Sequence, residues 1–288
     1  MSIAPAVNAW FEREKRDLPW RADGFPAWGI LVSEIMLQQT PVARVIPRLD
    51  EWLARWPTPA SLAAASPGDA VRAWERLGYP RRALNLHAAA VAITERHGGI
   101  VPSDIDELLA LPGVGDYTAR AVAAFAYGER HPVVDTNVRR VLARAIGGNG
   151  EAAPASTRRD LAAMEAQLPT DAAEARAFNA AVMELGAVVC TVRAPRCEEC
   201  PIADRCAWRA AGYPNYGGPR RPVQKKYEGS DRQVRGAILG ALRAREGSLG
   251  EHELDQIWPE AIQRGRALDG LLLDGLIVGS PESGYALP

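Results

Sequence analysis

The sequence lacks both a long apolar run and an excess of charge of one sign. No stretch of 18 consecutive apolar residues occurs among the 288 residues, so we expect no transmembrane helix and no membrane partner. Residues 1–10 lack the charged start and apolar stretch of a secretory signal peptide, which favours a cytoplasmic protein. The formal net charge of −1 gives no global sign of a nucleic-acid binder, so basic residues are informative only where they cluster.

Alternating strand patterns are also scarce. They are nearly absent before residue 230, and no internal repeat occurs. Helical patterns fill this region instead, and 47% hydrophobic residues are enough to bury a core. Prolines such as Pro41 and Pro67 stand where first helical turns begin, and the glycines at 98–99 stand where a helix stops. The predicted fold is therefore all-α, with helices near residues 5–16, 27–38, 41–55, 67–76, 81–97, 104–110, 116–127, 136–146, 156–167 and 171–189.

A basic stretch rich in glycine and proline separates the last part of the chain. Residues 211–229 are expected to form a linker. Helices are predicted beyond it at 231–246, 250–257 and 260–274, followed by short strands at 276–279 and 284–287. Three helices and a terminal hairpin are typical of a winged-helix module, which we predict for residues 230–288.

The sequence has only four cysteines, and they fall within 17 positions. Cys190, Cys197, Cys200 and Cys206 leave gaps of six, two and five residues. A reducing cytoplasm disfavours disulfides, whereas ligands this close can converge on zinc or on an iron–sulfur cluster. Zinc sites usually present two Cys-x-x-Cys pairs, and only one close pair occurs here. Four unrelated buried thiols are the remaining alternative, which such tight clustering disfavours.

Basic residues gather around these cysteines. Residues 190–226 hold eight lysines and arginines against three acids, and this local excess is suited to DNA phosphates. An ordinary solvated surface is the alternative. The basic residues are Arg193, Arg196, Arg205, Arg209, Arg220, Arg221, Lys225 and Lys226.

A glycine-containing turn joins two apolar helical segments at Leu111-Pro112-Gly113-Val114-Gly115. The glycines permit tight backbone geometry and a close approach by another chain. The following helix begins with backbone N–H groups that suit an anion. The turn is therefore a candidate site for an anion such as a phosphate, bound by Leu111, Gly113, Val114 and Gly115. The alternative is a simple tight turn between packed helices.

Two carboxylates are candidates for acid–base chemistry. On a helix, Glu34 has Ile30, Leu31 and Gln38 as neighbours, and an apolar environment raises a carboxyl pKa and favours a proton donor. The alternative is a glutamate that faces water. Asp135 follows an apolar pair and begins a helix, so it is expected to cap that helix whether or not it is catalytic.

Several motifs together resemble the MutY-type adenine DNA glycosylases, a branch of the endonuclease III superfamily. The resemblance covers about residues 8–210, and the cysteine spacing and the Leu-Pro-Gly-Val-Gly turn match that superfamily. Within it, the Glu-x3-Gln-Gln-Thr pattern is typical of the adenine-specific branch. The other matching segments are Leu18-Pro19-Trp20-Arg21, Ser33-Glu34-Ile35-Met36-Leu37-Gln38-Gln39-Thr40, Arg76-Leu77-Gly78-Tyr79, Asn85-Leu86-His87 and Met183-Glu184-Leu185-Gly186.

The resemblance implies a helix–hairpin–helix fold of two domains. One would join residues 1–21 to 133–210 and carry a [4Fe–4S] cluster on the four cysteines. The other would span residues 22–132. The implied partner is double-stranded DNA containing adenine opposite 8-oxoguanine or guanine, bound by a monomer associated with the nucleoid.

The same resemblance implies a role for each candidate residue. Glu34 would protonate N7 of adenine as a general acid, and Asp135 would stabilise the oxocarbenium-like sugar. Tyr117 and Asn137 would hold these two carboxyl groups. The bifunctional relatives have a catalytic lysine at the position of Tyr117, and tyrosine cannot form a Schiff base, so we expect no strong lyase activity. The implied substrate-binding residues are Trp20, Arg21, Gln38, Gln39, Thr40, Tyr79 and Pro80.

Three features depart from that branch. Pro80 stands where a second tyrosine often forms a wedge between bases, and Ala180 replaces a polar residue that often touches adenine. Residues 231–288 are too short for the usual C-terminal domain that reads 8-oxoguanine. Two other functions are alternatives: a thymine or uracil mismatch glycosylase of the same fold, which would generally lack the acid at Glu34, and a non-enzymatic iron–sulfur DNA-binding regulator.

Overall fold

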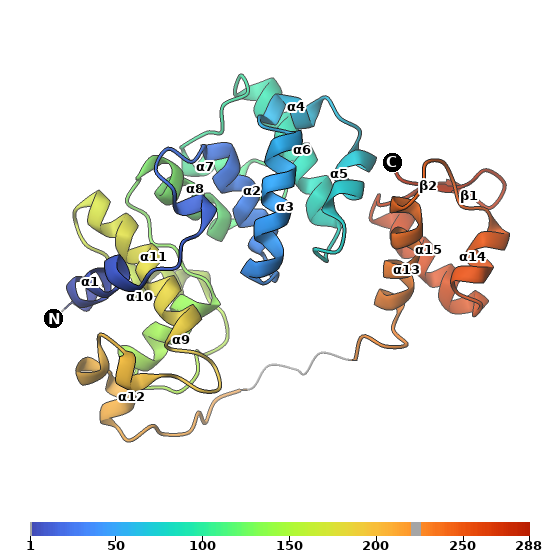
Figure 1. Cartoon of the computed structure of the whole chain (residues 1–288). Helices are drawn as coiled ribbons and strands as arrows, with labels where there is room; N and C mark the ends of the chain where they lie inside the picture. Colours follow the sequence, from blue (N-terminus) through green and yellow to red (C-terminus); the bar gives the residue numbers. More distant parts are fainter. Residues whose placement is uncertain (1, 220–225) are drawn as a thin grey trace. The chain divides into compact units, whose positions relative to one another are not determined.

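The chain is described by a computed structural model that covers residues 2–219 and 226–288. Its regular secondary structure is helical apart from one short hairpin (Figure 1). In the described residues, the only sheet is a two-stranded hairpin near the C-terminus. Prolines begin several helices as expected, because their fixed φ suits a first helical turn and the missing N–H has no partner there. The predicted all-α fold is therefore confirmed.

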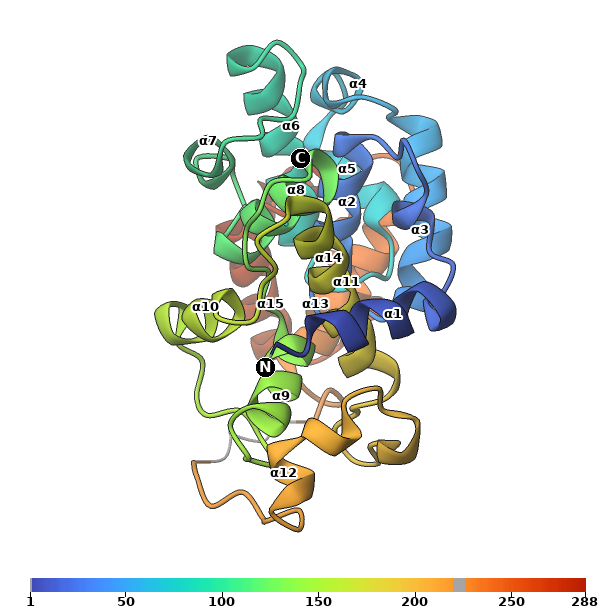
Figure 2. The same cartoon turned by 90° about the vertical axis from the view of Figure 1, so that its left-hand side faces the viewer.

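The chain divides into two compact units. The first comprises residues 1–30, 103–105 and 115–222, and its central helix is α11 (Ala172–Val188). Asp171 caps α11 by accepting a hydrogen bond from the Glu174 N–H at 2.9 Å. Helices α1 and α9 both pack against α11 (Figure 2). The unit contains α1 (Ala4–Glu14), α8 (Asp116–Tyr127), α9 (Thr136–Ala145), α10 (Thr157–Glu165), α12 (Ala207–Ala210) and the 3-10 turns η1 (Pro19–Arg21), η2 (Cys197–Glu199) and η3 (Ala203–Arg205).

The second unit comprises residues 31–102, 106–114 and 223–288. In its first part α6 packs against α4 and α5, and Trp52 makes edge-to-face contacts with Trp56 and Trp74 in the core. Most of α2 (Ala27–Leu37) belongs here. The other helices of this part are α3 (Val42–Arg55), α4 (Pro59–Ala63), α5 (Pro67–Trp74), α6 (Arg81–Arg96) and α7 (Ile105–Leu109).

The C-terminal part of this unit has the predicted order of three helices and a hairpin. It contains α13 (Asp231–Arg243), α14 (Glu251–Ile257), α15 (Ala261–Leu273), β1 (Val278–Ser280) and β2 (Gly284–Ala286). The strands pair antiparallel, and Leu249 adds a bridge to Tyr285. The likeness to a winged-helix module stays a prediction.

This C-terminal part packs on α5 and the start of α6. The Arg243 Nε donates to the Val71 carbonyl at 2.9 Å, and the Gly68 N–H donates to the Pro288 carbonyl at 2.6 Å. An ion pair of 3.3 Å joins Arg81 to Asp274. Residues 230–288 therefore contact the helices that precede and follow the Gly78-Tyr79-Pro80 segment.

The domain boundaries remain a prediction. The sequence placed α8 with residues 22–132, whereas the compact units place it with the cysteine-bearing residues. The predicted linker, 211–229, lies partly outside the described residues. No helix of residues 2–219 or 226–288 is long and apolar enough to cross a membrane.

Candidate functional site

Glu34 lies on α2 and is only 5% exposed. Ile30, Leu31 and Ile35 on the same helix are also buried. The alternative of a water-facing glutamate is therefore wrong. Burial is the environment that keeps a carboxyl group protonated, which is what a general acid requires. The role of Glu34 as that acid stays a prediction.

The backbone that follows α2 has an unusual conformation at Gln39. This residue has a left-handed φ of 58°, and Tyr79 has a left-handed φ of 47°. Both side chains are exposed, Tyr79 to 49%. Non-glycine residues rarely adopt such angles, and where they do they often belong to functional sites. Gln38 and Thr40 flank Gln39 and are less exposed.

One buried arginine, which the sequence did not single out, contacts both of these segments. The Arg82 guanidinium donates to the carbonyls of Gln38 at 2.6 Å and Gly78 at 2.8 Å. It also donates to the Thr40 hydroxyl at 3.0 Å. An arginine soon after Gly-Tyr-Pro was visible in the sequence, but no local pattern showed that it is buried.

Asp135 is the N-cap of α9, as expected. Its Oδ1 accepts from the Val138 N–H at 2.7 Å, and its Oδ2 accepts from the Asn137 side-chain amide at 2.7 Å. Burial raises the pKa of the Asp135 carboxyl, although these hydrogen bonds oppose the shift. The structure thus brings Asp135 and Asn137 together, as the sequence predicted, and fixes both carboxyl oxygens.

Asn137 is held in turn by Arg140, another residue that the sequence missed. Arg140 donates to the Asn137 side-chain oxygen at 2.7 Å, to the Gly186 carbonyl at 2.6 Å and to the Cys190 carbonyl at 2.7 Å. Gly186 allows this approach, because a Cβ there would lie 2.7 Å from the Asn137 Cβ. Hydrogen bonds therefore connect Asp135 to α11 and to the first cysteine.

Arg21 belongs to a separate ion-pair cluster in the first unit. Glu184 is 1% exposed and binds Arg16 at 2.6 Å and Arg21 at 2.9 Å. Burial favours the neutral acid, but the hydrogen bonds from Arg16 and Arg21 outweigh it and hold the pKa of the Glu184 carboxyl at about 2. Arg21 thus stabilises the buried Glu184 carboxylate, and its contact with adenine stays a prediction, as does that of the half-buried Trp20.

Tyr117 lies in the first turn of α8 and packs against Ala121, Ala124 and Val133. Just before it, Gly115 is the N-cap of α8. Tyr117 therefore has a packing role in the first unit, and its predicted contact with the catalytic acid stays a prediction.

The turn of residues 111–115 has the tight backbone geometry that its glycines predict, and phosphate binding there stays a prediction. Gly113 has a left-handed φ of 76°, and a Cβ there would lie 2.6 Å from the Asn85 Cβ. The Val114 N–H donates to the Leu111 carbonyl at 3.2 Å. Only glycine fits at position 113, because both the φ and the close approach of Asn85 exclude a side chain.

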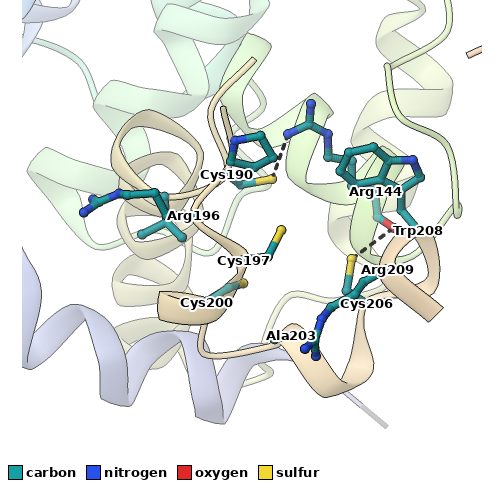
Figure 3. A pocket seen from close by; sticks show the side chains of 11 residues that line it. Arg144, Cys190, Arg196, Cys197, Cys200, Ala203, Cys206, Trp208 and Arg209 are labelled. Atoms are coloured by element: carbon teal, nitrogen blue, oxygen red, sulfur yellow. Dashed lines mark hydrogen bonds between the residues drawn. The ribbon is translucent and has the colours of Figure 1, made fainter. Parts of the chain in front are cut away.

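The four cysteines surround one cavity, as Figure 3 shows. The cavity is partly open to solvent, and Arg144 and Trp208 also line it. No three His, Cys, Asp or Glu side chains of the described residues are placed to hold a single metal ion. Four thiols around one cavity are the ligand set that a [4Fe–4S] cluster requires.

The surroundings of the cysteines fit an iron–sulfur cluster electrostatically. Burial raises the pKa of the Cys200 thiol to about 11 and also raises that of Cys190. The bound iron would favour the thiolates that burial disfavours. Arg144 adds positive charge, since its guanidinium lies 3.4 Å from the Cys190 sulfur and donates to the Thr191 carbonyl at 2.7 Å.

Two of the basic residues around the four cysteines form ion pairs with neighbouring acids. Arg196 pairs with Glu199 at 2.7 Å, and Arg209 pairs with Asp204 at 3.1 Å. Arg193 is exposed. A phosphate-binding role for this surface stays a prediction; Arg220, Arg221 and Lys225 lie outside the described residues.

Comparisons with known proteins agree with the fold and the cofactor. Residues 32–166 match the model of the HhH-GPD superfamily base excision DNA repair protein, and residues 190–206 match the iron-sulfur binding domain of endonuclease III. An adenine DNA glycosylase of Mycobacterium tuberculosis is 54% identical over 281 residues, which is 97% of this chain and 91% of the relative. The chain belongs to the adenine DNA glycosylase family. The predicted [4Fe–4S] cofactor is thereby confirmed, with Cys190, Cys197, Cys200 and Cys206 available to hold it.

Membership of this family extends to the C-terminal residues. The adenine DNA glycosylase of Mycolicibacterium smegmatis is 53% identical over 289 aligned residues, 100% of this chain and 97% of the relative. The short C-terminal part is therefore shared with that glycosylase. Among solved structures, a thermostable thymine-DNA glycosylase matches with a TM-score of 0.66 and 27% identity, covering 72% of this chain and 95% of its own.

Proposed function

We propose that this chain is an adenine DNA glycosylase of base excision repair that removes adenine opposite 8-oxoguanine or guanine. The observation that carries the proposal is the buried Glu34 within the Glu-x3-Gln-Gln-Thr pattern of a chain 54% identical to an adenine DNA glycosylase. A buried carboxyl group can remain neutral near pH 7 and act as a proton donor.

The proposed reaction begins with proton transfer. Glu34 gives its proton to N7 of adenine, and the bond between N9 and C1′ then breaks with its electron pair going to the base. Adenine leaves as a neutral molecule, and the sugar is left as an oxocarbenium-like cation. The Glu34 carboxylate then takes a proton from a water molecule whose oxygen bonds to C1′, which regenerates the acid and leaves an abasic site.

Asp135 stabilises the sugar cation in this mechanism. Its carboxylate must be ionised and correctly oriented when the cation forms. Hydrogen bonds from Val138 and Asn137 to its two oxygens favour the ionised form and fix the orientation. Arg140 holds the Asn137 amide so that its NH₂ group points to Asp135.

The enzyme is proposed to be monofunctional. A lyase step needs an amine that attacks C1′ and forms a Schiff base. Tyr117 occupies the position of the catalytic lysine of the bifunctional relatives, and a phenol cannot form that intermediate. The bound [4Fe–4S] cluster supplies structural order to the loop of residues 190–206, and no chemical step of base release is assigned to it.

The proposed partner is double-stranded DNA, bound by a monomer in the cytoplasm at the nucleoid. Phosphate contacts are assigned to the turn of residues 111–115 and carry no base specificity. The base opposite adenine is assigned to Gln39 and to the Tyr79-Pro80 wedge, and the adenine pocket to Trp20 and Arg21. Residues 230–288 are proposed to assist through the ion pair between Asp274 and Arg81, which begins α6.

Single-turnover base release tests this function. The duplexes hold A opposite 8-oxoguanine, A opposite G and T opposite G, and the variant Glu34→Gln keeps the shape of the side chain but cannot donate an acidic proton. We expect adenine release fastest opposite 8-oxoguanine and a loss of about 10²–10⁴-fold in the variant. Thymine release would instead favour the activity named for the similar thymine-DNA glycosylase structure. Tight binding without release of any base would favour a regulator.

A further inference from the structure

Three exposed residues of the second unit, Gln39, Glu75 and Tyr79, have a left-handed backbone, and two of them lie in predicted binding segments. Gln39 and Tyr79 have left-handed φ values of 58° and 47°. Both Gln39 and Tyr79 are assigned to the base opposite adenine in the proposed function. A non-glycine residue keeps such a conformation only where its surroundings hold it there. The structure therefore raises the question of what holds both segments at once.

Arg82 is the residue that does so. Beyond its bonds to Gln38, Thr40 and Gly78, its guanidinium donates to the Leu77 carbonyl at 3.2 Å, and its Nε donates to the Tyr79 carbonyl at 3.4 Å. The acceptors thus lie immediately before and after Gln39 and at Tyr79 itself. The guanidinium lies 5.1 Å from the Trp74 ring and 5.7 Å from the Tyr79 ring.

The Arg82 side chain also caps the C-terminal end of α2, the helix that carries Glu34. Arg82 donates to the carbonyls of Ile35 at 2.8 Å and Met36 at 3.0 Å, which lie in the last turn of α2. A positive charge is favourable at a helix C-terminus. Because Arg82 is only 8% exposed, it acts on bound DNA through the segments it holds.

We propose that Arg82 is a positioning residue for recognition of the opposite base, tying the Gln39 and Tyr79 segments into one rigid reading unit. The inference rests on the proposed adenine glycosylase activity and adds the residue on which its opposite-base preference depends. Only arginine suits this place, because its planar group carries five N–H donors in a fixed fork, whereas lysine offers three donors from one nitrogen.

The test compares Arg82→Lys with Arg243→Lys. Arg243 is a matched control, because it lies in the same unit and burial lowers the pKa of both guanidinium groups to about 10. Its backbone acceptor is Val71, outside both recognition segments. Single-turnover adenine release is measured opposite 8-oxoguanine and opposite G, with thermal melting to monitor the fold.

We expect Arg82→Lys to lower the ratio of the two release rates by about 10-fold or more, since small displacements of positioning groups can cost up to about 10²-fold. Arg243→Lys should leave the ratio unchanged even where it lowers the melting temperature. The double variant Arg82→Lys with Gln39→Ala should lower the ratio of release rates by less than the product of the two single-variant factors. Both substitutions disturb the same contact, that of Gln39 with the opposite base.

Three results would overturn the proposal: an unchanged ratio in Arg82→Lys, an equal loss on both duplexes, or the same ratio loss in Arg243→Lys. If Arg82→Lys does not fold, Thr40→Val replaces it, because that variant removes one acceptor of Arg82 and should lower the ratio in the same direction. If the wild type releases no adenine, the proposed function fails, and binding to duplexes with a non-cleavable adenosine analogue opposite each base decides the role of Arg82 separately.

Discussion

The substitution Gly186→Ala tests how accurately Asp135 must be placed. A Cβ at position 186 would lie 2.7 Å from the Asn137 Cβ, 2.9 Å from its carbonyl oxygen and 3.0 Å from its carbonyl carbon. Ordinary contact begins at 3.4 Å, so Asn137 must move away from α11 by about 0.7 Å. Two of the three close atoms belong to the backbone of α9, and no flexible side chain can absorb the shift.

The displacement should reach Asp135 directly, because Asn137 donates to its Oδ2 at 2.7 Å. A movement of this size in a group that orients a catalytic carboxylate should lower adenine release by about 10- to 100-fold. The cost in stability should be smaller. Overpacking costs roughly 1–3 kcal/mol, and replacing a helical glycine by alanine recovers roughly 0.5–1 kcal/mol.

Gly240→Ala is the matched control. Gly240 lies within α13, and an added Cβ would meet nothing within 4 Å. This variant should therefore be more stable by roughly 0.5–1 kcal/mol and release adenine at the wild-type rate. Single-turnover kinetics and chemical denaturation measure both quantities. Folded Gly186→Ala protein with the wild-type rate would show that α9 tolerates the shift and that the placement of Asn137 is not critical.

Three further predictions concern charge and chemistry. Glu184→Gln should destabilise the protein by about 3 kcal/mol at neutral pH. Because the pKa of Glu184 is lowered to about 2, this difference in stability should vanish as the pH falls from about 5 towards 2. Chemical denaturation of both proteins across that pH range measures it. Asp135→Asn should abolish adenine release. Since burial raises the pKa of Asp135, the wild type should also gain stability relative to the variant as the pH is lowered through that pKa, and a loss of stability relative to the variant over this range would contradict the reasoning. Tyr117→Lys should gain covalent trapping on DNA by borohydride, and no trapped complex would contradict the monofunctional reasoning.

The helices were largely predictable, because their signals are local. Asp171 caps α11 where the sequence placed the start of that helix. Its side chain accepts a hydrogen bond from an N–H three residues later, and such a bond forms without any contact from the rest of the fold. The five-residue α4 was missed, although Thr58 and Ser61 form a capping box there, because so short a helix shows no apolar period.

The site was predictable only in part. The four cysteines are metal ligands that lie close together in the sequence, and Gly113 occupies a turn that only glycine can form. Both features are therefore visible in the sequence itself. The burial of Glu34 could be expected only from its apolar neighbours on α2. Arg82 and Arg140 gave no signal, because each is defined by acceptors up to 47 or 50 residues away in the chain.

Arg82 and Arg140 each bind the part of the structure that carries or orients one of the two carboxyl groups. Arg82 binds carbonyls in the last turn of the helix that carries Glu34, and Arg140 binds the side chain that orients Asp135. Burial lowers the pKa of each guanidinium group. Each group donates hydrogen bonds to backbone carbonyls and to one side chain. Because Arg140 also binds the Cys190 carbonyl, order in the cluster loop bears on the position of Asn137 and so on Asp135. In the proposed mechanism, a cofactor without a chemical step would thus still contribute to base release, because its first ligand, Cys190, fixes backbone that Arg140 binds.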